Sequence, residues 1–184
     1  MTTEVRNPSE APGELDLVRR FVNTLDIEDG TDDLNTPAGA RVWLEGEDWR
    51  TRVGERELHE LVSFREAVRD LIGSRGTEGD EDAVAAIDSI ARRHPLVVSF
   101  SSAEVLFPPS KGVHGFIERI LGLIAAAEID GSWDRMKTCA NHGCRWLFYD
   151  HSRNRSRTWC TMDLCGSQAK MRAYRSRQAA LASP

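Results

Sequence analysis

The sequence has no long apolar segment, and its first 138 residues contain no cysteine. The longest purely apolar run is 123–127, whereas a helix that spans a bilayer needs about 20 residues. Residues 1–8 have neither the apolar core nor the cleavage-site pattern of a secretory signal. We therefore expect a soluble, cytoplasmic protein that has no membrane partner and forms no disulfides.

The sequence also lacks the common signatures of catalysis. It has no glycine-rich phosphate loop, no internal repeat and no Ser/His/Asp arrangement with an interpretable spacing. His59, His94 and His114 are scattered along the chain, which is typical of structural histidines. We therefore predict that the protein is not an enzyme and has no catalytic residues.

All four cysteines fall close together near the C-terminus. Cys139 and Cys144 form one Cys-x4-Cys pair, Cys160 and Cys165 form a second, and fifteen residues separate the pairs. Two such pairs can place four thiolates tetrahedrally around one Zn²⁺ ion. A site closed by four sulfur ligands is structural, because no coordination position remains for a substrate. We predict one structural zinc ion bound by these four residues, and no other cofactor.

Other arrangements of the same cysteines are open. Two disulfides would need an oxidising compartment, and four unrelated buried cysteines would be scattered over the chain. An iron–sulfur cluster also uses four thiolates, and the spacing alone does not exclude it. His142 lies inside the first pair and could replace one thiolate, although the four thiols already suffice. Spacing and expected compartment together favour zinc.

Charge is distributed unevenly along the chain. Residues 137–184 contain nine Lys and Arg against two Asp and Glu, a net charge of +7. Residues 1–136 contain 15 Lys and Arg against 27 Asp and Glu, a net charge of −12, so the whole chain carries −5. A basic module suits a polyanion, which would repel the acidic body. The asymmetry predicts a polyanionic partner for the C-terminal module.

Apolar periodicity predicts that the N-terminal part is mainly helical. Apolar residues recur at helical spacing over 14–27, 54–72, 81–93 and 112–129. Thr36-Pro37 is typical of an N-cap followed by proline in the first turn, and predicts a further short helix that carries Trp43.

Two short β-rich runs, 96–100 and 104–107, predict one hairpin in this part. A break in the helical pattern at 131–133 marks a boundary. We expect a disordered start, a helical domain and a zinc finger, over 1–13, 14–133 and 134–184. The fold class is α+β: a predominantly helical N-terminal domain with a small β-hairpin, followed by a C-terminal four-cysteine zinc finger that ends in a basic helix.

The C-terminal module offers two groups of cations. Arg153, Arg155 and Arg157 alternate with polar residues, and in an extended segment all three guanidiniums would share one side as a phosphate comb. In a helix they would spread apart, and one or more could instead pair with Asp150 or Asp163. A helix over about 167–181 adds four cations, which flank a face that we expect to pack, formed by Met171, Tyr174, Gln178 and Leu181. The candidate DNA-contacting residues are Arg153, Arg155, Arg157, Lys170, Arg172, Arg175 and Arg177.

The motif Cys139-x4-Cys-Arg-Trp-Leu-Phe-Tyr-Asp-x-Ser-Arg-Asn-Arg-Ser-Arg-x-Trp-Cys-Thr-Met-x-x-Cys165-Gly166 resembles the CGNR zinc finger. Phe21-Val-Asn-Thr-Leu-Asp26 and Trp43-Leu44 are similar to the opening of the ABATE domain, which that family joins to the finger. The resemblance implies a bacterial, stress-related transcription regulator, with the cysteines as zinc ligands and the finger as the DNA-binding part. The name-giving Cys-Gly-Asn-Arg is here Cys165-Gly166-Ser167-Gln168, so an arginine of the family pattern is missing.

We therefore predict a DNA-binding transcription regulator whose acidic body senses a small-molecule or protein effector or forms a homodimer. The alternative is a zinc-stabilised protein-interaction or small-ligand-sensing protein that does not contact DNA. A salt-dependent affinity for DNA would distinguish the first from the second, because phosphate contacts release counterions.

Overall fold

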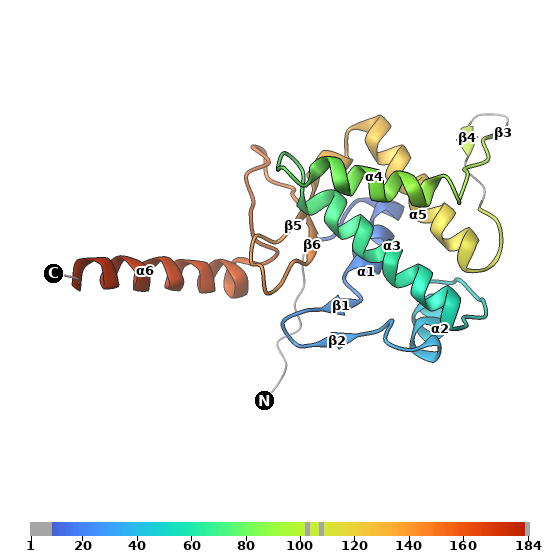
Figure 1. Ribbon diagram of the computed structural model, residues 1–184. Coiled ribbons are helices and arrows are strands. Elements are labelled where there is room, and N and C mark those ends of the chain that lie inside the picture. The colour runs from blue at the N-terminus through green and yellow to red at the C-terminus, as the bar shows by residue number, and fades with distance from the viewer. Residues whose placement is uncertain (1–8, 102–103, 107–108, 183–184) are drawn as a thin grey trace.

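Helices packed around one apolar core make up the body of the protein (Figure 1). The computed structural model describes residues 9–101, 104–106 and 109–182. The helices in these ranges are α1 (Asp16–Val22), α2 (Pro37–Gly46), α3 (Glu55–Gly73), α4 (Asp80–Ala91), α5 (Gly112–Asp130) and α6 (Ser167–Ala182). Short 3-10 turns, η1 (Gly13–Leu15) and η2 (Trp133–Arg135), and a π-turn, η3 (Met162–Gly166), connect them. None of the described helices is long and apolar enough to cross a membrane.

Three antiparallel strand pairs complete the described fold. They are β1 (Leu25–Asp26) with β2 (Thr31–Asp32), β3 (Ser99–Ser101) with β4 (Glu104–Leu106), and β5 (Met136–Thr138) with β6 (Leu147–Tyr149). The β3–β4 pair is the predicted hairpin; its turn, 102–103, lies outside the described residues. The predicted α+β class, a mainly helical first part followed by a four-cysteine segment and a C-terminal helix, is confirmed.

Local sequence explains where α2 begins and why α1 is shorter than predicted. Thr36 caps α2 as expected, because its Oγ1 accepts the Gly39 N–H at 3.1 Å and Pro37 needs no hydrogen-bond partner there. The first helix ends at Val22 instead of continuing to 27. Thr24 donates its hydroxyl to the Phe21 carbonyl at 2.8 Å, which satisfies the last turn and lets the chain leave as β1.

The core of the body is aromatic at its centre. Phe21 of α1 contacts Phe64 of α3, Phe116 of α5 and Trp43 of α2, with ring centroids 5.4–5.8 Å apart. Phe21, Phe64 and Phe116 are fully buried, so each contributes about 1.5–3 kcal/mol through removal of its apolar surface from water. The helical stripes seen in the sequence therefore converge on one centre.

The same core extends into the C-terminal part of the chain. Trp133, Met136, Leu147 and Tyr149 belong to the cluster of buried apolar residues that contains the helices of the body. The β5–β6 pair thus packs on α3 and α1, and it also leads into the cysteine loops (Figure 1). Packing of the body and geometry of the cysteines are therefore linked through two short strands.

The start of the chain lies against the same strands. Residues 1–8 of the predicted disordered start, 1–13, lie outside the described residues. Ala11 is buried, and its N–H donates to the Asp16 carboxylate at 2.8 Å. The Ser9 carbonyl accepts the Tyr149 N–H at 3.0 Å, which satisfies the outer edge of β6. Residues 9–13 are therefore fixed at both ends.

His94 makes the stability of the body depend on pH. Its ring is 1% exposed, stacks on His114 with centroids 4.2 Å apart, and has Nε2 3.1 Å from Glu60 Oε1. Burial, with His114 as a second cause, lowers the pKa of His94 below its ordinary value of about 6.5. The folded state therefore binds a proton less readily than the unfolded state. Stability is fully present above pH 6.5 or so and is lost as the pH falls through the lower folded-state value.

We expect the free energy of unfolding, measured by urea denaturation, to fall between roughly pH 7 and pH 5. His94→Gln should flatten this dependence, whereas His59→Gln, an exposed control on α3, should leave it unchanged. An equal slope in all three proteins would show that other groups determine the acid response.

Candidate metal centre

The four cysteine sulfurs meet where β5 ends and β6 begins. All four Sγ atoms lie within 4.8 Å of one another. The Sγ atoms of Cys144 and Cys160 are 3.6 Å apart, and those of Cys160 and Cys165 are 3.7 Å apart. Four sulfurs at about 2.3 Å from a tetrahedral zinc ion stand about 3.8 Å from one another. The spacing of the thiols is therefore that of a tetrahedral metal site.

The chemistry of the thiols also fits a divalent cation. All four are at most 3% exposed, and burial together with mutual repulsion opposes four negative charges at this spacing. Hydrogen bonding between the two side chains lowers the pKa of Cys139 and raises the pKa of Cys144. A soft divalent ion would displace the remaining protons and hold four thiolates.

Backbone groups support the first cysteine pair. The Cys139 N–H donates to the Trp146 carbonyl at 2.9 Å, which closes the loop at the ends of β5 and β6. Within the loop the Asn141 carbonyl accepts the N–H groups of Cys144 and Arg145 at 2.8 and 3.0 Å. The Asn141 N–H donates to Cys139, and the Trp146 N–H donates to Cys144. Such contacts stabilise thiolates and fix their orientation.

The second pair is held by the π-turn η3. Cys165, inside this turn, is fully buried, and its Sγ lies 3.6 Å from Asn141 Nδ2. A Cβ on the next residue, Gly166, would approach Met162 Sδ to 2.9 Å and the Trp159 ring to 3.4 Å. Any larger residue at this position would have to displace the flexible end of the Met162 side chain.

Aromatic side chains enclose the sulfurs. Phe148 is fully buried among the four cysteines, and Trp146 and Trp159 pack against them. These three aromatics form a small apolar core around the four thiols. His142 is exposed and lies outside the group of four ligands, so the thiols alone form the site.

A buried carboxylate, Asp150, ties the loop between the two cysteine pairs to β5. It is fully buried and accepts Lys137 Nζ at 2.7 Å and the N–H groups of Ser152 and Arg157 at 2.9 Å. Burial would raise the pKa of Asp150, but the hydrogen bonds from Lys137 and Ser152 outweigh it and hold the pKa well below its usual range. Lys137 also donates to the carbonyls of Arg155 and Arg157, so all three protons of its ammonium are used.

The predicted comb of arginines does not form, because residues 152–155 make a turn instead of an extended strand. The Arg157 guanidinium points inward, donates to the carbonyls of Trp159 and Cys160, and lies over the Phe148 ring. It stabilises the metal centre and is not presented to a partner on the surface.

The other two arginines of this loop remain at the surface. Arg155 pairs with Asp134 at 3.2 Å, although its side chain is 49% exposed. Arg153 is exposed at the tip of the turn. Of the three predicted contact residues in the loop, Arg153 is therefore the one best placed for a phosphate.

Two side chains of the body hold the finger from inside. Asn23 donates Nδ2 to the Leu147 carbonyl at 2.9 Å and accepts the Leu147 N–H on Oδ1 at 2.7 Å. Arg69 of α3 is fully buried and donates to the carbonyls of Val22 and Arg145. The Arg69 guanidinium thus joins the carbonyl at the end of α1, that of Val22, to a carbonyl of the first cysteine loop, that of Arg145.

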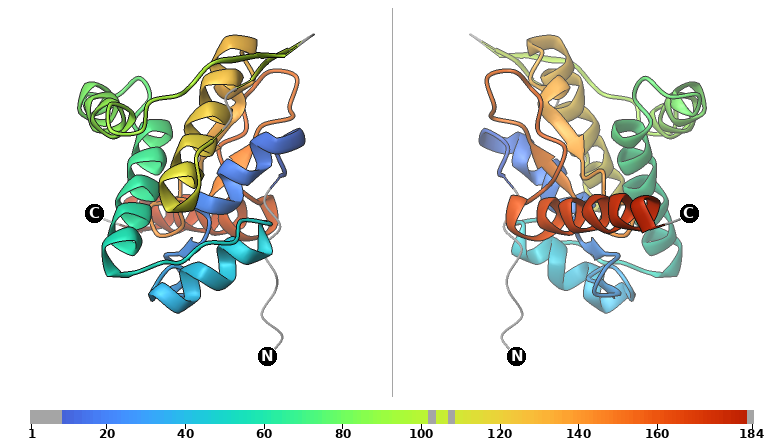
Figure 2. Two further views of the ribbon diagram at one scale, coloured as in Figure 1. Left: turned by 90° about the vertical axis from the view of Figure 1, so that its right-hand side faces the viewer. Right: turned by 90° about the vertical axis from the view of Figure 1, so that its left-hand side faces the viewer.

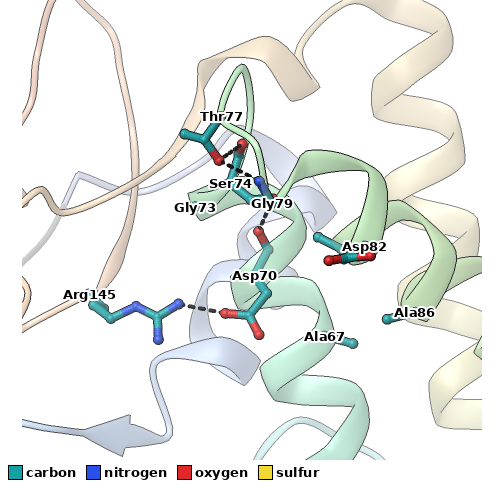
Figure 3. Close-up of a pocket in the computed structure, with 10 residues that line it drawn as sticks. Ala67, Asp70, Gly73, Ser74, Thr77, Gly79, Asp82, Ala86 and Arg145 are labelled. Carbon is teal, nitrogen blue, oxygen red and sulfur yellow. Dashed lines mark hydrogen bonds and ion pairs between the residues drawn. The ribbon is translucent and has the colours of Figure 1, made fainter.

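A groove of about 470 Å³ lies between α3, α4 and the first cysteine loop (Figure 3). The Arg145 side chain reaches toward α3, where it meets Asp70 at 2.6 Å (Figure 3). Asp82 lies on the α4 side of the same groove. Arg145, the residue after a metal ligand, is thus in direct contact with a surface of the body.

Helix α6 projects away from the rest of the molecule (Figures 1 and 2). Its first turn packs on η3, and Gln168 donates to Glu28 at 3.1 Å. Met171 and Tyr174 are 52% and 53% exposed, so the expectation that their face packs within the chain is wrong. The helix continues directly from η3 and carries these residues past the finger. Gln178 is exposed as well, and the side chain of Leu181 lies outside the described residues.

Helix α6 carries the accessible positive charge. Lys170, Arg172, Arg175 and Arg177 are all exposed, and the helix contains no Asp or Glu. By contrast, Lys137, Arg145, Arg155 and Arg157 are engaged with carboxylates or carbonyls of the protein itself. The basic surface therefore lies mainly on one helix.

Comparison with protein families gives one match for the C-terminal part of the chain and another for the body. Residues 135–178 match the family described as "CGNR zinc finger". Residues 15–130 match ABATE, described as "Putative stress-induced transcription regulator". A search of curated proteins gave no match. Because the ABATE match covers more than half of the sequence, the chain belongs to the ABATE family and carries a C-terminal CGNR zinc finger.

Proposed function

We propose that this protein is a non-enzymatic transcription regulator that binds DNA through α6, with one structural zinc ion holding the finger. Four sulfur ligands in a closed tetrahedral arrangement are typical of structural zinc. The ion would be held by Cys139, Cys144, Cys160 and Cys165, and would fix the position from which α6 departs.

The single observation that carries the proposal is the exposed, basic α6. Its four cations are exposed on a helix that projects from the body, so they can reach a phosphate backbone without a clash from the other helices (Figure 1). One of them, Arg172, also donates to Asn141 Oδ1 at 3.4 Å. Arg is suited to bidentate contacts with phosphate. Arg153, which is exposed on the turn at 152–155, adds a fifth surface cation to the C-terminal module.

The family name and the acidic body support the same function. The body would be repelled by DNA, so it is suited to a regulatory role away from the duplex. An effector is proposed for this part, and the groove beside Asp70 is where a small molecule would act on Arg145 and so on the first cysteine loop.

Salt dependence tests the proposal. For five neutralised phosphates we expect a log–log slope of about −4.5, so duplex affinity falls about 500-fold between roughly 50 and 200 mM salt. Arg175→Ala combined with Arg177→Ala should weaken binding and make the slope shallower by about two units. Arg56→Ala, an exposed arginine on α3, is the matched control and should change neither quantity. Electrophoretic mobility shift of the zinc-loaded protein on mixed duplexes measures both the affinity and its salt slope.

Two results would contradict direct DNA binding. One is the absence of a shift at low salt with correctly metallated protein. The other is a partner retained in a pull-down after nuclease treatment at high salt, with no duplex affinity, which would identify the finger as a protein-interaction module.

A further inference from the structure

We propose that α6 is also an arm that docks onto the acidic face of a second copy of this chain, in a groove beside α2. The docking surface on the arm is the exposed pair Met171 and Tyr174, and the acceptor is the groove lined by Val42 and Trp43. The arm is a helix with an apolar stripe and positive charge, and the groove has an apolar floor and acidic residues, so the two are complementary. The partner is a second copy because one chain cannot bring its own arm into its own groove.

The arm presents an apolar stripe between cations. Met171 and Tyr174 stand three residues apart, so they share one face of α6. Each is more than half exposed. Lys170 and Arg177 lie along one edge of this face and Arg175 along the other, at about 100° per residue. Anchors three residues apart with charged flanks are typical of a helix that binds in a groove.

The acceptor groove has the opposite charge and a matching apolar floor. It has a volume of about 540 Å³ and lies where β2 leads into α2. Val42, 63% exposed, and Trp43 form the floor, while Asp32, Asp33 and Asn35 form the rim. An exposed valine beside a half-buried tryptophan is an apolar surface that an aromatic side chain can cover.

Charge complementarity selects this groove. Residues 26–48 contain eight Asp and Glu and one Arg, a net charge of −7, and α6 carries four cations and no acid. Two of these acids already have partners, since Asp32 pairs with Arg65 and Glu47 with Arg20. Burial and the neighbouring Asp32 raise the pKa of Asp33. A guanidinium brought by the arm would stabilise the ionised form of this carboxylate. Opposite charges of this size steer association and weaken as salt rises.

The arm of one chain cannot enter its own groove. Gln168, in the first turn of α6, donates to Glu28, and from there the helix runs away from α2 (Figures 1 and 2). Two chains can exchange arms, and the contact then occurs twice around a two-fold axis. A reciprocal exchange doubles the buried area and closes the assembly as a dimer.

An exchanged arm is withdrawn from DNA. This consequence rests on the proposed function, because the same cations cannot meet phosphates and carboxylates at once. Duplex DNA should therefore convert the dimer into DNA-bound monomer. The dimer itself does not depend on DNA binding, so the two can fail separately.

Complementation between variants tests the exchange in the full, zinc-loaded chain. One variant removes the arm anchors, Met171→Ser with Tyr174→Ser, and the other removes the floor, Val42→Ser. Sedimentation velocity at about 50 mM salt should show the parent protein as a dimer and each variant with its dissociation constant raised at least tenfold. Val84→Ser, an exposed valine on α4, is the control and should dimerise like the parent.

Mixing the two variants distinguishes arm exchange from any other self-association. A heterodimer retains one intact arm and one intact groove. A fluorescently labelled mixture should therefore associate at a protein concentration at which each variant alone is monomeric. A mixture that stays monomeric overturns the proposal, as does a parent protein that is monomeric at low salt. Dimerisation that is insensitive to all three substitutions overturns it too. The Met171→Ser and Tyr174→Ser variant keeps all the cations of α6. Its mobility shift on duplex DNA therefore tests DNA binding independently of dimerisation.

Discussion

Cys160→Ser should remove the metal from the purified protein and unfold the finger. Cys160 is fully buried, and its Sγ lies within 3.7 Å of the sulfurs of Cys144 and Cys165, so it stands at the centre of the cluster. Structural zinc sites contribute an apparent 10–16 kcal/mol or so in small fingers, as much as a whole domain's stability of about 5–15 kcal/mol. Elemental analysis should fall from one zinc per chain to far below one, and hydrogen exchange should lose protection over 139–166.

The effect should also reach the body, because Met136 and Leu147 leave the common core when β5 and β6 are released. A fall of the melting temperature on the order of 10 °C follows from the loss of a few kcal/mol in a chain of this size. His142→Ala, an exposed residue in the first cysteine loop, is the control and should retain one zinc. A Cys160→Ser protein that keeps stoichiometric zinc would refute the four-sulfur site.

Asp150→Ala should destabilise the protein by about 3–5 kcal/mol, the usual result of leaving one partner of a buried ion pair alone. The change leaves the Lys137 ammonium without its 2.7 Å partner and removes the acceptor of the Ser152 and Arg157 N–H groups. Urea denaturation of the zinc-loaded protein measures the loss. Asp163→Ala removes an exposed carboxylate from the same module and should cost less than about 0.5 kcal/mol.

The same carboxylate should contribute to acid unfolding. Its pKa is lowered in the folded state, so its stabilising effect is present above the ordinary value of about 3.9 and is lost as the pH falls through the lower one. Asp150→Ala should remove this part of the acid response. If Lys137→Met combined with Asp150→Ala were as unstable as Asp150→Ala alone, the unpaired ammonium would not be the cause.

The metal centre could be predicted from sequence because its signal is local. Four cysteines at fixed spacing need only two tight loops to meet, and backbone N–H groups within each loop support them. Helices such as α3 and α5 were predictable for a similar reason, since their apolar residues recur every three or four positions along one segment. The cap at Thr36 is equally local.

The errors concern side chains whose partners are distant in sequence. Arg69 appears polar and outward-facing on a helical wheel, but the end of α1 and the first cysteine loop supply carbonyls for it. Likewise Arg157 was counted as a surface cation, and Cys160 and Trp159 accept its protons. A periodic pattern reports which face is polar, and it does not report whether another segment satisfies that polarity inside the fold.

The opposite error occurred on α6. Met171 and Tyr174 have the spacing of a packed face, and the structure gives them no partner surface among the described residues of the same chain. Amphipathic spacing indicates that a helix has an apolar side without saying which molecule covers it.

Asn23 sets an order on the biogenesis of this protein. Its amide pairs with both backbone groups of Leu147, 124 positions later, so the segment after the N-terminal helix gains this contact only after most of the chain has left the ribosome. At about 5–20 residues per second, that interval lasts several seconds or more. Metal binding near the C-terminus therefore affects a segment that was synthesised seconds earlier. In a new chain that captures no ion, Asn23 would lack its partner on β6, and the end of the first helix would stay open to proteases.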